Sequence, residues 1–257
     1  MRARISSVAA TNMKHHDEIL MQQLHPRVYE HTQAEGTKVP WDVGFAQPAI
    51  EEVSSRFRGK VLDAGCGLGD NTRWLGTLPT VSAAVGVDIS RAAIEEARMR
   101  LERDEERGER VAQPPVEFRV ASLDAPPPAG EEGEFDAVLD AGVYHCVEDQ
   151  AKYLEAMTTR VKPGGVAVAL EFSDANPDSA AEHGTRANAP RQADASSLAR
   201  AVPGPRRMSK EALRSGWEAA GWDVERIDDV RFMTRPTPQL GTSAAALRLI
   251  ATRKPRA

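Results

Sequence analysis

Short apolar runs alternate along most of the chain with segments of helical periodicity. The runs have the length and the Val, Ile and Leu content of buried strands, whereas the intervening segments place apolar residues three and four positions apart. The sequence predicts strands over residues 60–64, up to 88, 116–120, 135–140, 166–172, 222–234 and 244–252. Because strands and helices alternate, we expect an α/β fold with a doubly wound, mostly parallel sheet and helices on both faces.

The predicted helices have recognisable ends. Ser90 and Ser209 stand where N-caps are expected, and Gly221 stands where a helix ends. A turn is predicted over residues 162–165, and a bend in the strand near the C-terminus is predicted at Asp228. Helices are expected over residues 49–57, from 71, from 91, over 150–161 and over 210–220.

The first 48 residues have a different pattern. Residues 13–31 show helical spacing, and residues 39–48 have a turn-like composition that includes Trp41. We therefore expect a helical lid over residues 1–48, followed by a main domain over residues 49–257. Three side chains of this segment are interpreted as surface residues, with a substrate role as the alternative: His25, Tyr29 and His31.

Residues 173–207 also break the alternation. This run is rich in Ala, Pro, Ser, Asn and Asp and has few side chains to bury. We expect a flexible insertion within the main domain, which is either a mobile substrate-side segment or simple disorder.

One stretch joins a predicted strand to a predicted helix through a glycine-rich turn. Gly65, Gly67 and Gly69 follow Asp63 with one residue between each pair. Glycine permits close approach of a ligand to the backbone, and the helix start offers N–H groups and a positive dipole end. Such a turn forms a nucleotide-type site at the carboxyl end of a parallel sheet. Asp88 ends the next apolar run, at the distance expected for an acid that binds ribose hydroxyls.

The position of the third glycine distinguishes between nucleotides. The dinucleotide fingerprint G-x-G-x-x-G requires glycine at position 70, where Asp70 stands. This disfavours a nicotinamide-dependent oxidoreductase, although that class and a binding-only protein with a vestigial pocket both remain alternatives.

Composition narrows the range of partners. The chain has 257 residues, a formal net charge of −5 and 28% charged residues, so nothing in its charge attracts it to nucleic acid or to an anionic membrane. No apolar run is long enough to span a bilayer, and the N-terminus is a poor signal peptide. The two cysteines, Cys66 and Cys146, lack metal-type spacing and are interpreted as reduced thiols. We expect a cytoplasmic protein without a metal site, as a monomer or homodimer.

Four segments in order resemble the class I S-adenosylmethionine-dependent methyltransferases. They are the D-x-G-x-G-x-G turn at 63–69, the acid Asp88, the strand Phe135–Asp140 and the turn Val161–Gly165. The segment Pro40–Gly44 also resembles the P-W-D-x-G segment of thiol, halide and thiopurine methyltransferase-like enzymes. The resemblance implies a Rossmann-like fold with a reversed C-terminal strand, and S-adenosylmethionine as cofactor with S-adenosylhomocysteine as product.

The resemblance also implies roles for individual residues. Gly65 and Gly67 would give backbone approach to the cofactor, Asp63 would hold its amino end and Asp88 its ribose. Four further side chains would complete the site: Trp41 over the cofactor, Ile89 on the adenine face, and Asp140 near the methionine amino group or the methyl group, with Ser122 at the adenine. The family usually has Asp at position 122, so either the Ser122 hydroxyl with the Leu123 backbone or Asp124 would contact the adenine amino group.

The acceptor determines whether a base is needed. A thiol has a pKa of about 8.5 and a phenol of about 10, so a thiol needs less help to ionise. His145 is the candidate base and Tyr144 the candidate orienting group, although both residues also have a simple packing interpretation. We expect a small-molecule acceptor with sulfur favoured; oxygen or nitrogen of a phenol, quinol or natural product is the alternative. The acidic chain lacks a basic and aromatic run for nucleic acid.

Overall fold

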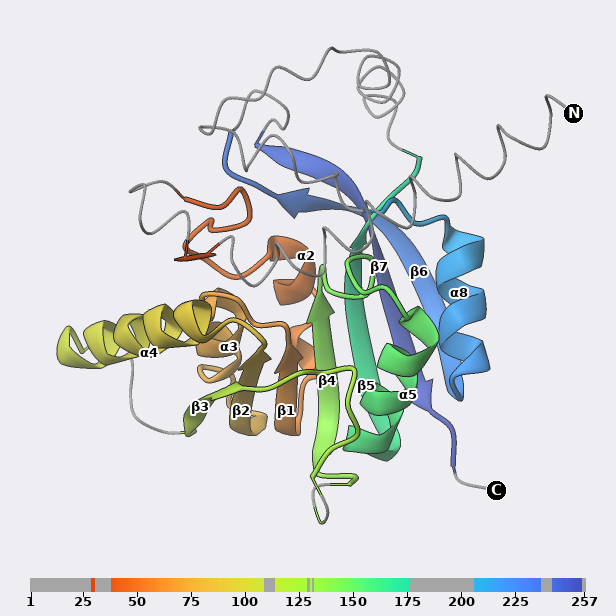
Figure 1. The fold of residues 1–257 in the computed structure, drawn as a ribbon, viewed down its shortest axis with the longest axis horizontal. Coiled ribbons are helices and arrows are strands. Elements are labelled where there is room, and N and C mark those ends of the chain that lie inside the picture. Colours follow the sequence, from red (N-terminus) through yellow and green to blue (C-terminus); the bar gives the residue numbers. More distant parts are fainter. Residues whose placement is uncertain are drawn as a thin grey trace, which may run out of the picture.

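A seven-stranded sheet forms the centre of the protein (Figure 1). The computed structural model describes residues 29–30, 38–108, 114–128, 130, 132–175, 206–236 and 242–255. The strand order is β3-β2-β1-β4-β5-β7-β6. The strands are β1 Gly59–Ala64, β2 Val81–Asp88, β3 Val116–Val120, β4 Phe135–Ala141, β5 Val161–Phe172, β6 Trp222–Met233 and β7 Ser243–Arg253.

Among the seven strands that the structure describes, only β7 runs against its neighbours. It pairs antiparallel with both β5 and β6, whereas β1 to β5 pair in parallel. Parallel neighbours need a crossover, and the predicted helices provide it. The predicted α/β fold, mostly parallel with a reversed C-terminal strand, is confirmed.

Helices cover both faces of the sheet. The described helices are α2 Pro48–Glu51, α3 Asp70–Leu75, α4 Arg91–Glu106, α5 Gln150–Arg160 and α8 Lys210–Ala219, with a 3₁₀ turn at Ser54–Arg56. The side chains of Ser90, Asp149 and Ser209 accept N–H groups at the starts of α4, α5 and α8. These caps satisfy donors that have no partner inside a helix, which explains where the three helices begin.

Three local predictions differ from the structure. The helix expected over 49–57 ends at Glu51, because the carbonyl of Ala49 accepts Nη1 of Arg248 at 2.7 Å while the Val53 N–H bonds Ile50 instead. The expected bend at Asp228 is absent, and β6 instead shifts register between Val224 and Arg226.

The predicted turn after α5 lies inside β5 rather than before it. Pairing with β4 jumps from Phe135–Val161 to Ala137–Val166, so residues 162–165 loop out of the ladder. Gly164, at φ 79°, permits the loop to turn while the strand continues.

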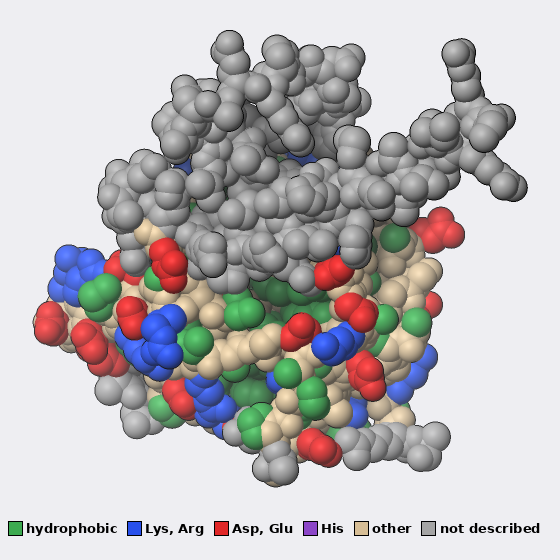
Figure 2. All heavy atoms as spheres, viewed as in Figure 1, with side chains coloured by type: hydrophobic (Ala, Val, Ile, Leu, Met, Phe, Trp, Pro, Cys, Tyr) green, Lys and Arg blue, Asp and Glu red, His purple; other side chains and the backbone are tan. Residues whose placement is uncertain are grey.

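Two expected segments fall mainly outside the described residues: the helices over 13–31 and the insertion over 173–207. Among the helices that the structure describes, none is long and apolar enough to cross a membrane. On the visible part of the described surface, acidic and basic side chains are interspersed (Figure 2).

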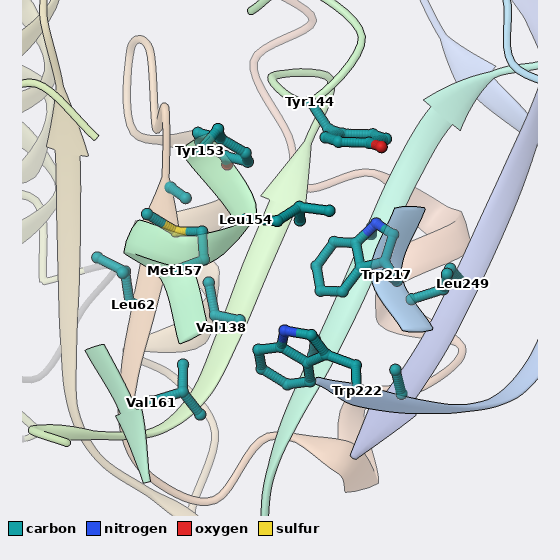
Figure 3. Packing of buried hydrophobic residues seen from close by; sticks show 14 of the residues in the cluster. Leu62, Val138, Tyr144, Tyr153, Leu154, Met157, Val161, Trp217, Trp222 and Leu249 are labelled. Atoms are coloured by element: carbon teal, nitrogen blue, oxygen red, sulfur yellow. The ribbon is translucent and has the colours of Figure 1, made fainter. Parts of the chain in front are cut away.

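The core beneath α5 and α8 contains two tryptophans with different polar environments. Trp217 and Trp222 are both fully buried and meet edge to face, with ring centroids 5.3 Å apart (Figure 3). The indole N–H of Trp222 donates to Oγ1 of Thr158 at 2.8 Å. Nε1 of Trp217 is buried and has no hydrogen-bond partner among the described residues.

This difference predicts unequal costs for the same substitution. Trp222→Phe removes a buried hydrogen bond as well as volume, and is expected to lower the free energy of unfolding by about 2–3 kcal/mol. Trp217→Phe loses similar volume but also removes an unpaired N–H, so its cost is expected to be about 1 kcal/mol or less. Urea unfolding of both variants would measure this, and equal costs would contradict the account.

Candidate cofactor and acceptor site

Four acidic residues lie at the carboxyl ends of adjacent parallel strands. Asp63, Asp88, Asp140 and Glu171 lie at or near the ends of β1, β2, β4 and β5, and each is at most 9% exposed. In the register, Ala64 pairs with both Val87 and Asp140, which places the first three acids along one edge of the sheet. Burial of a carboxyl group without compensation is costly, so this edge is built for partners that supply it.

The glycine turn after β1 uses its own backbone donors. The N–H groups of Gly65 and Cys66 donate to the carbonyl of Val87, that of Gly67 to Oδ2 of Asp88, and that of Gly69 to Cys66. A phosphate-binding turn needs such N–H groups to be free for the ligand. The turn therefore favours close approach of a ligand to the backbone over phosphate binding.

Gly65 and Gly67 serve different purposes. A side chain on Gly65, at φ 65°, would lie 2.1 Å from Cγ2 of Val143, so this glycine is explained by packing against the segment after β4. At Gly67, φ 53°, the nearest atom to an added Cβ is the hydroxyl oxygen of Tyr29, at 2.7 Å. Gly67 thus faces the N-terminal segment.

Asp63 has one bonded and one unbonded oxygen. Oδ2 accepts the Thr72 hydroxyl at 2.5 Å, whereas Oδ1 is buried with no hydrogen-bond partner among the described residues. Burial, together with the nearby carboxylates of Asp140 and Asp88, raises the pKa of Asp63 to about 7 despite the Thr72 hydrogen bond. A cationic ligand group beside Oδ1 would offset both effects.

Asp88 lies where a ribose-binding acid is expected, but it also shapes the turn. Oδ2 accepts the Gly67 N–H at 2.9 Å and Oδ1 accepts the Ser90 N–H at 2.8 Å. The next residue, Ile89, is 56% exposed, and Val120 at the end of β3 is 39% exposed. These two apolar side chains at neighbouring strand ends form a surface suited to one face of a flat ring.

Ser122 and Asp124, the two side chains predicted as alternatives for the adenine contact, are hydrogen-bonded to each other. The hydroxyl of Ser122 donates to the exposed carboxylate of Asp124, while Leu123 is buried. The hydroxyl and the carboxylate therefore act as one hydrogen-bonded pair.

Residues 38–47 form a strap that is attached at both ends. Asp42 pairs with Arg100 of α4 at 2.9 and 3.2 Å, and this pairing, opposed by burial, lowers the pKa of Asp42. At the other end, Gln47 exchanges two hydrogen bonds with the backbone of Met233 on β6, at 2.7 and 3.1 Å. The strap therefore connects the β1–β3 half of the site to the β6 side.

Trp41 and Tyr29 place aromatic rings against the glycine turn. The indole N–H of Trp41 donates to the Tyr29 hydroxyl at 2.7 Å, and the rings meet edge to face with centroids 6.4 Å apart. Tyr29 is only 6% exposed, so its interpretation as a surface residue is wrong. The reason is that Gly67 leaves room for the Tyr29 hydroxyl.

Asp140 and Tyr144 are both built into the turn after β4. Asp140 accepts the N–H of Val143 at 2.8 Å, the N–H of Tyr144, and the hydroxyl of Tyr153 at 2.8 Å. The Tyr144 ring packs against Tyr153 and Trp217 and is 3% exposed. These contacts favour a structural role for Tyr144 and a turn-forming role for Asp140.

His145 meets a buried acid. Its Nδ1 lies within hydrogen-bond distance of Oε2 of Glu171, and its backbone N–H donates to the same oxygen at 3.2 Å. His145 is 2% exposed, and its ring lies 5.1 Å from that of Phe172. Glu171, Thr72 and Tyr29 were not predicted as site residues. Glu171 does interrupt the continuous apolar run of β5, and an acid in such a run was the available signal.

The raised pKa of Asp63 predicts a pH-dependent stability. A carboxyl group whose pKa is higher in the folded than in the unfolded state contributes stability that is present near pH 4 and lost as the pH rises through about 7. Asp63→Asn cannot ionise, so its stability relative to wild type is expected to increase by about 2 kcal/mol between pH 5 and pH 8. Urea unfolding at the two values would measure it, with exposed Glu95→Gln as control. A pH-independent difference would contradict the assignment.

Comparisons with known proteins agree with this geometry. A family model described as a methyltransferase domain matches residues 62–169. Trans-aconitate 2-methyltransferase of Rhodopseudomonas palustris strain HaA2 is 33% identical over 129 residues, 50% of this chain and 44% of that protein. The chain thus spans less than half the length of the curated relatives it matches.

Two solved structures extend the likeness over nearly the whole chain. One, from work on the conversion of a disulfide bond into a thioacetal group during echinomycin biosynthesis, is 31% identical with a TM-score of 0.68, covering 90% of this chain and 92% of the other. A methyltransferase from Anabaena variabilis shares the fold at 15% identity, with a TM-score of 0.64, covering 90% and 94% of the two chains. The chain therefore belongs to the class I S-adenosylmethionine-dependent methyltransferases, not to the nicotinamide-dependent oxidoreductases.

Proposed function

We propose that this protein transfers a methyl group from S-adenosylmethionine to a sulfur atom of a small molecule by direct displacement. The observation that carries the proposal is the buried Oδ1 of Asp63, which has no partner among the described residues and lies beside the glycine turn. A carboxylate in that position is suited to an ammonium or sulfonium ligand and unsuited to a phosphate.

The residues present fit this cofactor at each of its parts. Gly67 allows close approach to the backbone, Asp63 would hold the amino end, and Asp88 would hold the ribose hydroxyls. Ile89 and Val120 offer the exposed apolar surface for the adenine, and Ser122 with Asp124 offers polar groups at its edge. Trp41 and Tyr29 would cover the bound cofactor, since the Tyr29 hydroxyl lies against Gly67 and Trp41 of the strap donates to that hydroxyl.

When bound, the cofactor supplies a methyl group on a positively charged sulfur, which is a good leaving group. The residues of the chain then have three tasks: they hold the acceptor in line, exclude water and take up a proton where the acceptor carries one. Attachment of the strap through Arg100 and Gln47 would help to exclude water, because these noncovalent bonds can hold the strap over the bound cofactor.

Sulfur is the acceptor that these residues serve best. A thiol needs only a modest base, and His145 is the one that we assign. The resemblance of Pro40–Gly44 to the thiol, halide and thiopurine methyltransferase-like enzymes supports the same choice, as does the sulfur chemistry named for the 31% identical relative. Tyr144 was predicted to orient the acceptor, but its packing favours support of the turn that carries His145.

A second candidate acceptor is one sulfur of a disulfide, favoured by that same relative. A disulfide sulfur has a lone pair and no proton, so methylation requires no base and leaves a positive charge on the acceptor sulfur. Removal of a proton from the adjacent carbon, with cleavage of the S–S bond and formation of a C–S bond, then gives a thioacetal. In that sequence His145 would accept the carbon-bound proton.

The proposed function also implies the partners, the location and the oligomeric state of the protein. We propose a small-molecule substrate rather than nucleic acid or membrane, a cytoplasmic location, and a monomer or homodimer. The acidic net charge of −5 supports the first of these.

Cofactor binding is expected to depend on Asp88. Asp88→Asn keeps the shape but loses the charge that would bind two hydroxyl groups, so the Kd for S-adenosylhomocysteine should rise about 10- to 100-fold. Isothermal titration calorimetry would measure it, with exposed Glu95→Gln as the control. A Kd unchanged in Asp88→Asn would remove Asp88 from the site.

The acceptor is expected to be sulfur, with a base needed only for a protonated one. Wild-type protein with S-adenosylmethionine should methylate 2-phenylethanethiol and leave phenol unmodified. In His145→Gln the rate should fall by about 10²-fold or more, the usual contribution of a general base. Mass spectrometry of the products would measure both. Methylation of phenols alone would favour an O-methyltransferase, and thioacetal formation from a dibenzyl disulfide probe would favour the second candidate.

A further inference from the structure

We propose that Glu171 is a positioning residue that holds the His145 imidazole by Nδ1, so that Nε2 carries no proton and is directed to the acceptor. The proposal rests on the proposed function, because it assigns His145 as the group that receives the proton. It adds a residue that neither the sequence motifs nor the comparisons assign.

One oxygen of Glu171 contacts His145 twice. Oε2 accepts the backbone N–H at 3.2 Å and also faces Nδ1 of the ring. Two contacts from one residue to one oxygen fix both the backbone and the side-chain rotation of His145. Glu171 is itself fully buried in β5, an interior strand of the sheet, which restricts its side chain.

Packing leaves the imidazole a single orientation. The ring lies 5.1 Å from that of Phe172, which in turn stacks on Phe232 at 4.9 Å. On another side, Cε1 lies 3.3 Å from where a side chain on Gly142 would begin. Within the described part of the chain, Nε2 has no hydrogen-bond partner. The ring is therefore held at one nitrogen and available at the other.

The distribution of protons over Glu171 and His145 leaves Nε2 without a hydrogen. Burial raises the pKa of Glu171 to about 8, so this carboxyl group carries a proton for part of the neutral range. Because Oε2 already accepts the backbone N–H, that proton is placed in the hydrogen bond between the carboxyl groups of Glu171 and Asp140. Oε2 then accepts Nδ1–H whether Glu171 is charged or neutral.

The groups around the pair support the same arrangement. Asp140 from β4 and Tyr153 from α5 bond to each other, and Tyr144 packs beside them. The guanidinium group of Arg207 lies over the Phe172 ring, and its carbon is 5.8 Å from the ring centroid. The pKa of Asp140 is raised by burial and by the charge of Glu171. The acidic neighbours of His145 are thus Glu171, which contacts it, and Asp140, which shares a hydrogen bond with Glu171.

The His145–Glu171 pair would serve one step, in which a proton leaves the acceptor thiol. The acceptor S–H bond breaks and its proton moves to Nε2, while Nδ1–H stays bonded to Oε2. The acceptor sulfur forms a bond to the methyl carbon as the carbon–sulfonium bond of the cofactor breaks. The proton on His145 then passes to water, which restores the pair.

A purely structural role does not explain why an acid stands at position 171. A buried acid with one unpaired oxygen destabilises the fold relative to an apolar side chain of similar size. Glu171→Met, which keeps the volume, is therefore expected to fold and to be at least as stable as wild type. Glu171→Gln can still accept Nδ1–H through its amide oxygen and is the conservative variant. Glu155→Gln, exposed on α5, is the matched control.

The first test reads the tautomer directly and needs no acceptor. Long-range ¹H–¹⁵N spectra of the imidazoles, with the His145 signal among six histidines identified by its loss in His145→Gln, should show Nδ1–H and bare Nε2 in wild type. Glu171→Gln should keep this pattern, and Glu171→Met should give a mixture of tautomers. A wild-type His145 with its proton on Nε2 would overturn the proposal.

The second test separates positioning from general damage. 4-Nitrobenzenethiol is already a thiolate at neutral pH, whereas 2-phenylethanethiol must lose a proton. Glu171→Met should lower kcat for 2-phenylethanethiol about 10-fold or more, within the range of general-base effects, and change kcat for 4-nitrobenzenethiol by less than about twofold. Glu171→Gln should recover most of the loss, and the Kd for S-adenosylhomocysteine should not change.

The outcomes separate the two proposals. Equal losses for both thiols, or weakened cofactor binding in Glu171→Met, would mean that Glu171 only supports the fold. If wild type methylates neither thiol but the His145 signal shows the expected tautomer and responds to Glu171→Met, the proposed sulfur acceptor fails and the positioning contact stands.

Discussion

Carboxyl groups kept out of water at one edge of the sheet are the constraint on which this site depends. Asp63, Asp88, Asp140 and Glu171 are all nine-tenths or more buried at neighbouring strand ends. Each is tolerated through donors from nearby backbone or side chains, except that Oδ1 of Asp63 and Oε1 of Glu171 have none among the described residues. An edge with this many buried acidic groups is suited to a cationic ligand and unsuited to a phosphate.

The strap over residues 38–47 is bonded to elements on both sides of this edge. It is attached by an ion pair to Arg100 on the cofactor side and by backbone hydrogen bonds through Gln47 on the β6 side. Because the Asp42 carbonyl also accepts Nε of Arg235 and the Gln47 N–H also donates to Asn71, both parts of the strap connect the glycine-turn side of the sheet to the β6 side. Gly67 makes this coverage possible, since any side chain there would meet the Tyr29 hydroxyl.

The fold could be predicted from the sequence because alternating strand and helix patterns leave few topologies, and the caps at Ser90 and Ser209 fixed two helix starts. The differences between the predicted and the observed elements arise from contacts between distant parts of the chain. Arg248 comes from β7, about 200 residues away, to take the Ala49 carbonyl. In the site, motifs located Asp63 and Asp88, but no local pattern could show that Tyr29 meets Gly67 or that Glu171 faces His145. Both are contacts between distant segments, and only the acid within the apolar run of β5 hinted at the second.

The two halves of the edge solve opposite electrostatic problems with the same residue type. On the cofactor side, Asp63 keeps an unpaired oxygen that a permanent positive charge can satisfy on binding. On the side proposed for the acceptor, Glu171 faces His145, whose positive charge in the proposed mechanism would exist only after a proton has been transferred. The first arrangement favours a bound ground state, whereas the second favours the charge that develops during reaction, which is the kind of interaction that accelerates a chemical step. The placement of buried acids on both sides of Asp140 therefore allows the proposed cofactor binding and the proposed proton transfer to share one row of strand ends.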